Sequence, residues 1–127
     1  MLRLIQVSGM PVGIPVVRTI RCQPGMFGQL NKKGQVVVSD GTSPIGIIDE
    51  HKDDAENTIV NKCAAVWTVR GIYATDQVEK RCSFLTARLL YVSNRGRLTT
   101  RCRSKSHRSV GVVVSYLSGV LEFWFWG

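Results

Sequence analysis

The most informative absences in this sequence are those of a metal site and a catalytic site. No Cys-x-x-Cys pair occurs, and the two histidines, His51 and His107, are isolated. Because a structural zinc site usually takes its ligands in close pairs, we expect neither a metal nor another cofactor. The sequence also lacks a Gly-x-Ser-x-Gly elbow and a glycine-rich phosphate loop. We therefore do not expect an enzyme.

Long apolar runs are missing as well. No stretch approaches the roughly 18 apolar residues of a membrane span, and Arg3 and Gln6 interrupt the segment where a signal peptide needs an unbroken apolar core. We expect a protein made in a cytoplasm, with no membrane partner. The 127 residues, of which 44% are hydrophobic, suffice for one domain with a real core.

The charges are distributed unevenly along the chain, whose formal net charge is +8. Six of the nine acids fall between Asp40 and Glu56, whereas nine of the seventeen bases fall between Lys80 and Arg108, a span without acids. Such a basic segment binds nucleic acid, an anionic membrane or an acidic protein surface, or is simply solvated. The candidate partner-binding bases are Arg95, Arg97, Arg101, Arg103, Lys105 and Arg108.

Two stretches resemble each other and predict two related β units. The first, 34–48, reads Gly-Gln-Val-Val-Val-Ser-Asp-Gly-Thr-Ser-Pro-Ile-Gly-Ile-Ile. Aligning Gly34 with Gly96 also matches Ile-Gly-Ile-Ile with a later Val-Gly-Val-Val, after three extra residues in the second turn. Because an Asp-Gly pair suits a tight turn, we expect residues 35–39 and 45–48 to form a hairpin.

The overall pattern predicts a mainly β fold, a compact small barrel or sandwich built from two related hairpin units, with at most one short helix. Glycines and prolines exclude a helix from residues 1–20, which form an extended arm on a neighbouring copy or an edge strand. Residues 21–127 then form a single β domain, with units at roughly 27–73 and 89–127.

Local patterns predict individual elements. Residues 66–70 alternate as in one strand that ends on Gly71, and residues 75–89 fit either a short helix or an ordered loop. Residues 91–93 and 97–100 form a hairpin through Asn-Arg-Gly.

The C-terminal residues predict a second hairpin, of residues 110–116 with 120–126. Its last strand has apolar residues on one face and two rings, Trp124 and Trp126, on the other. A half-buried sheet needs only one apolar face. The two rings are therefore either part of the core of a small barrel or contacts with another segment or subunit.

The four cysteines also leave two interpretations open. Reduced, buried thiols are typical of a cytoplasmic protein. Disulfides within or between subunits are the alternative for Cys22, Cys63, Cys82 and Cys102.

Several stretches carry a family resemblance. They are Gly-x-Leu at 28–30, the run from Gly34 to Asp49, and the segments 66–77 and 90–99. In these the chain resembles the small head decoration, or cement, proteins of tailed bacteriophages. The resemblance implies a virion structural protein without catalytic residues, which binds the capsid exterior and stabilises the head by clamping neighbouring capsid subunits.

The resemblance also implies partners. These are the major capsid protein and neighbouring copies of the chain, in a homo-oligomer for which a trimer is favoured, after assembly in the host cytoplasm. The basic loop would dock on an acidic capsid surface, Trp124 and Trp126 would anchor the contact, and the N-terminal segment would add a strand to a neighbour.

The alternative function is a small-barrel nucleic-acid-binding protein that uses the basic loop 95–108. Proteins of that kind combine basic grooves with exposed aromatic side chains on which bases stack. Residues 95–108 contain no aromatic residue. We therefore favour the capsid-binding hypothesis and keep nucleic-acid binding as the second one.

Overall fold

The computed structural model of the chain describes residues 1–16, 22–49 and 63–127. These residues form eleven β-strands in two antiparallel sheets and no helix, which confirms the predicted mainly β fold and matches a sandwich. Residues 75–89, for which a short helix or a loop was expected, continue from a strand into an ordered loop. No described helix is long and apolar enough to cross a membrane.

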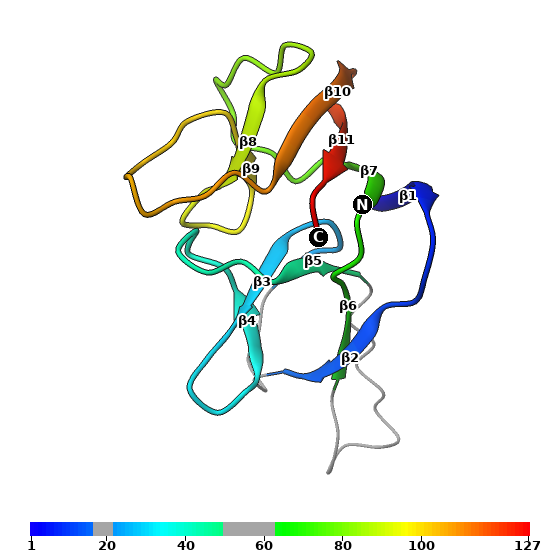
Figure 1. Cartoon of the computed structure of the whole chain (residues 1–127), viewed down its shortest axis with the longest axis vertical. Helices are drawn as coiled ribbons and strands as arrows, with labels where there is room; N and C mark the ends of the chain where they lie inside the picture. Colours follow the sequence, from blue (N-terminus) through cyan, green and yellow to red (C-terminus); the bar gives the residue numbers. More distant parts are fainter. Residues whose placement is uncertain (17–21, 50–62) are drawn as a thin grey trace.

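The five-stranded sheet, in the lower half of Figure 1, has the order β2-β6-β5-β3-β4. Its strands are β2 (Val12–Pro15), β3 (Phe27–Leu30), β4 (Val36–Val38), β5 (Gly46–Ile48) and β6 (Cys63–Trp67). We call these five strands unit 1.

The six-stranded sheet, in the upper half of Figure 1, has the order β1-β7-β11-β10-β8-β9. Its strands are β1 (Leu2–Val7), β7 (Gly71–Thr75), β8 (Leu89–Val92), β9 (Leu98–Thr99), β10 (Gly111–Leu117) and β11 (Val120–Phe125). We call β7–β11 unit 2, to which β1 adds a sixth strand.

The two units have the same strand order, which confirms that they are related. In the β3–β4 turn, Asn31 Oδ1 accepts hydrogen bonds from two backbone amides, and Ser93 Oγ does the same in the β8–β9 turn. Gly34 and Gly96 hold the same place in these turns, with φ of +75° and +73°. The structure therefore supports the alignment of Gly34 with Gly96 at the level of individual hydrogen bonds.

The N-terminal segment forms edge strands within its own chain. β1 pairs with β7 in one sheet, and β2 pairs with β6 in the other. The chain therefore crosses between the sheets twice at the same corner, from β1 to β2 and from β6 to β7, and Gly9 faces Val69 there. The predicted continuous strand 66–70 is wrong, because β6 ends at this corner and β7 begins after it. The last residues of the expected segment 1–20 lie outside the described residues.

The predicted hairpin of residues 35–39 with 45–48 is also wrong. β4 and β5 lie on opposite sides of β3, where Gly28 pairs with Val38 on one side and with Gly46 on the other. The Asp-Gly segment therefore crosses the end of β3 instead of closing a tight turn. The other two predicted hairpins, β8–β9 and β10–β11, are confirmed.

One apolar cluster joins the two units. Three of its buried members come from unit 1, namely Phe27, Ile47 and Trp67, and the others come from unit 2 and its loops. The Tyr73 and Phe123 rings stack with centroids 6.1 Å apart, and the Phe27 ring lies within this group. Since burying such a ring stabilises a fold by about 1.5–3 kcal/mol, this cluster is the main stabilising contact between the units.

Candidate functional site

The most distinctive surface follows from the repeat. In unit 1, adjacent strands place Phe27, Ile47 and Trp67 side by side; we call them the inner row. The equivalent positions of unit 2 are Leu89, Val112 and Trp124, where Leu89 pairs with Val112 and Val112 pairs with Trp124. We call Leu89, Val112 and Trp124 the outer row. The two rows are equivalent positions of one repeated scaffold.

The two rows differ sharply in burial. Phe27 and Ile47 are fully buried and Trp67 is 8% exposed, because unit 2 covers this face. Leu89 and Trp124 are 49% and 40% exposed. Nothing in the described part of the chain covers the outer row as unit 2 covers the inner row, so Trp124 is not a core residue.

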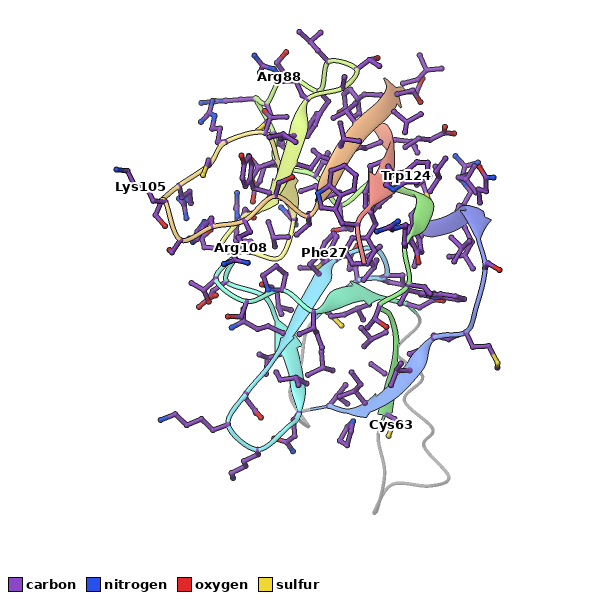
Figure 2. The ribbon with its side chains drawn as sticks, in the orientation of Figure 1. Phe27, Cys63, Arg88, Lys105, Arg108 and Trp124 are labelled. Atoms are coloured by element: carbon purple, nitrogen blue, oxygen red, sulfur yellow. The ribbon has the colours of Figure 1, made fainter. Side chains whose placement is uncertain are left out.

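The apolar surface of the outer row extends across β7 to β1. Ile72 pairs with Trp124, and Ile5, at an irregularity in the β1–β7 register, is 46% exposed. A hollow of about 420 Å³ lies beside Trp124. It is lined by Ile5, Gln6, Val7, Ser8, Arg70, Gly71, Ile72 and Trp124. In Figure 2, Trp124 lies at the right of the upper sheet, far from Lys105 at the left.

Trp126 lies in a different hollow, of about 280 Å³, although it follows Trp124 by two residues. Its indole Nε1 donates to Ser109 Oγ at 3.4 Å, and Pro44 and Arg108 line the same hollow. The two hollows share no lining residue. The structure therefore separates the two predicted anchors, and Trp126 lies at the seam between a unit 1 loop and a unit 2 loop.

The structure also divides the predicted basic loop. Arg95, Arg101 and Arg103 line a third pocket, and Arg108 lines the hollow of Trp126. Arg97 is half-buried beside that third pocket, where its charge acts on Glu79. Lys105 lies at the outer end of the β9–β10 loop (Figure 2).

Glu79 is the carboxylate that pairs with Arg95. Arg95 donates to it twice, from Nη2 at 2.7 Å and from Nε at 3.2 Å, and Ser93 Oγ donates at 2.7 Å. Partial burial raises the pKa of the Glu79 carboxyl, but the hydrogen bonds from Arg95 and Ser93 and the charges of Arg95 and Arg97 outweigh it. The net effect is a pKa below the ordinary value for glutamate.

All four cysteines are free thiols in the structure. Cys63 and Cys102 are exposed, and Cys22 and Cys82 are half-buried. Burial raises the pKa of the Cys22 thiol, and the Cys82 sulfur lies 3.2 Å from Thr99 Oγ1. A disulfide between neighbouring copies, formed through the exposed Cys63 or Cys102, stays a prediction.

The described residues contain no group of three or more histidine, cysteine or acidic side chains placed to hold a metal ion. No family model matches the chain, and neither the curated proteins nor the solved structures include a match. The surfaces described above are therefore the basis of a functional proposal.

Two parts of these surfaces do not follow from the sequence patterns alone. Lys80 lines the third pocket together with three of the predicted arginines, although it precedes the predicted basic loop 95–108. Leu89 and Val112 look like ordinary strand residues. The repeat could have identified them, because it aligns them with Phe27 and Ile47, which are buried where the units pack together.

Proposed function

We propose that this chain is a virion structural protein that binds the outer surface of a phage capsid and clamps neighbouring capsid subunits. One observation carries the proposal. The inner row is buried where the two units of the chain pack together, and the equivalent outer row is exposed. The exposed face of unit 2 is thus equivalent to the face of unit 1 that packs against unit 2.

The outer row has the composition of an interface centre. Trp124 is a large ring flanked by Val112 and Ile72, with Arg70 at the edge of the adjacent hollow. Aromatic and arginine side chains dominate binding energy at protein interfaces, and partly exposed apolar surface of this kind marks a contact site. A cement protein needs such adhesive faces on a rigid β scaffold and no active site.

The expected partners are the major capsid protein and neighbouring copies of this chain on the outside of the virion. Many copies around the symmetry axes of a shell favour a closed homo-oligomer, and a trimer is the arrangement we propose. The bases of the β9–β10 loop would steer the chain toward an acidic shell surface and set its register more than its affinity.

Co-sedimentation with unexpanded and expanded capsid shells tests this function. We expect the chain to bind expanded shells at a fixed stoichiometry and Trp124→Ala to weaken binding by at least about tenfold, as for an interface hot spot. Leu89→Ser should also weaken binding. Leu30→Ser is its matched control, because Leu30 is 47% exposed but lies in unit 1, outside the row.

Two results would contradict the proposal. One is undiminished shell binding by both outer-row variants. The other is the absence of shell binding together with an affinity for oligonucleotides that falls steeply with salt, which would support the nucleic-acid-binding alternative.

A further inference from the structure

A basic pocket of about 280 Å³ lies on unit 2, apart from the outer row. It gathers residues from the loop after β7, the β8–β9 turn and the start of the β9–β10 loop. Four cations and one carboxylate contribute to its lining. It is lined by Glu79, Lys80, Cys82, Ser93, Asn94, Arg95, Thr99, Arg101 and Arg103.

The carboxylate in this pocket is already engaged. Glu79 accepts two hydrogen bonds from Arg95 and one from Ser93, so both of its oxygens have donors. Within the described residues, no other carboxylate lies within ion-pair distance of Lys80, Arg101 or Arg103. Three cations thus face one hollow with their charges uncompensated by the described chain, an arrangement that an added anion would stabilise.

Local contacts hold part of the pocket in place before any ligand arrives. Arg101 donates from Nη2 to the carbonyl of Arg81 at 3.2 Å and from its backbone amide to Thr99 Oγ1 at 3.1 Å. Arg81 itself has a φ of +65°, a strained conformation for a residue with a side chain. Such strain tends to occur at functional sites, and here it aims the carbonyl that positions Arg101.

The repeat shows which cations of the pocket have no counterpart in unit 1. The unit 1 positions that match Thr99 and Arg101 are occupied by Val37 and Ser39, and Ser39 Oγ bonds to Gln29 within the sheet. The turn hydrogen bonds are kept in both units, and Lys33 matches Arg95, but unit 1 has no cation at the position of Arg101. Arg101 is therefore an addition to a scaffold that unit 1 forms without a cation at that position.

We propose that this pocket binds the carboxylate side chains of an acidic segment of a protein partner. The inference rests on the proposed function in one respect, namely that the capsid protein would supply the segment. Arg95 already grips a carboxylate with two N–H donors, the geometry that guanidinium groups favour. The lining has no aromatic side chain on which a nucleic-acid base could stack.

Binding of a fluorescent, end-blocked peptide of six glutamates to the full chain at low salt tests the pocket. The test variant is Lys80→Gln with Arg103→Gln; both side chains are exposed, and neither donates a hydrogen bond within the described chain. The matched control is Lys32→Gln with Lys33→Gln, which removes the same charge from the equivalent turn of unit 1. We expect about tenfold weaker peptide binding by the test variant and less than about a twofold change for the control.

Equal weakening by both variants would overturn the pocket, since it would show that net charge alone attracts the peptide. Tighter binding of a single-stranded oligonucleotide of equal charge, lost in the test variant, would overturn the carboxylate assignment. Shell binding distinguishes this inference from the proposed function. If the test variant sediments with shells as the control does while Trp124→Ala does not, the pocket fails as a capsid contact and the docking face stands. If the wild-type chain binds no shells but binds the peptide as predicted, the proposed function fails and the pocket stands.

Discussion

Units 1 and 2 share a scaffold and differ in what covers it. Both have the same strand order and the same turn hydrogen bonds. In unit 1 the Trp67 face is packed under unit 2, and in unit 2 the equivalent Trp124 face is exposed. The features shared by the two units therefore define the structure. We expect function where the units differ, at the outer row and at the basic pocket.

The glycines of the repeated strand show which features are structural. A Cβ at Gly46 would lie 2.5 Å from the Trp67 carbonyl oxygen, and one at Gly111 would lie 2.0 Å from the Trp124 carbonyl oxygen. In both units the neighbouring strand approaches too closely for any side chain. The matching Ile-Gly-Ile-Ile and Val-Gly-Val-Val runs are therefore required for packing and say nothing about function.

The largest expected difference between the units comes from the two equivalent tryptophans. Trp67→Ala should lower the free energy of unfolding by about 3–5 kcal/mol, because it leaves a cavity in the shared cluster and removes the hydrogen bond from Trp67 Nε1 to Asp49. Trp124→Ala should lower it by less than about 1 kcal/mol, because its ring is substantially exposed. Urea denaturation of both variants measures this, and equal losses would contradict the assignment of inner and outer rows.

Much of this fold could be predicted from the sequence. Turn residues between β-prone runs identify β8–β9 and β10–β11, and the aligned Gly34 and Gly96 reveal the repeat. Strand pairing is where prediction fails. An Asp-Gly pair predicts a tight turn from local preference alone, but β3 lies between β4 and β5 and pairs with both. That arrangement depends on contacts between residues distant in the sequence, which a local pattern cannot predict.

The candidate site could be predicted only in part. Alternation in the last strand correctly places Trp124 opposite the buried Phe123. The predicted basic loop 95–108 contains Arg95 and Arg101, but Lys80, which lines the same pocket, lies outside that loop. Burial is the quantity that separates equivalent residues of the two units, and it depends on how the units pack together.

A second pair of equivalent positions should respond with opposite signs. Gly25 has a φ of +99° and faces Thr75 Oγ1, where an added Cβ would lie within 2.2 Å. Gly25→Ala should therefore lower the free energy of unfolding by at least about 2 kcal/mol. Ala87, its counterpart in unit 2, has a φ of +70° and is exposed, so Ala87→Gly should raise stability by about 0.5 kcal/mol. Thermal unfolding of the two variants checks the signs, and a shift in the same direction for both would contradict the equivalence.

The smallest expected effect concerns the carboxylate of the basic pocket. Because the pKa of Glu79 is lowered in the folded chain, its ionised form stabilises the fold above the pKa of an unfolded glutamate. This contribution is lost as the pH falls through the folded-state pKa. The urea midpoints of the wild type and Glu79→Gln should therefore converge on acidification, with Glu122→Gln as a control for the loss of one carboxylate. A difference that persists unchanged at the acid end would show that Glu79 acts through packing and not through its charge.

The most direct test of the central claim is the reactivity of the two equivalent tryptophans before and after shell binding. Hydroxyl-radical footprinting read by mass spectrometry reports the solvent exposure of each indole separately. We predict that Trp124 reacts readily in the free chain and is strongly protected on the shell, and that the buried Trp67 reacts slowly in both states. Unchanged reactivity of Trp124 in shell-bound protein would show that the outer row is not the docking face.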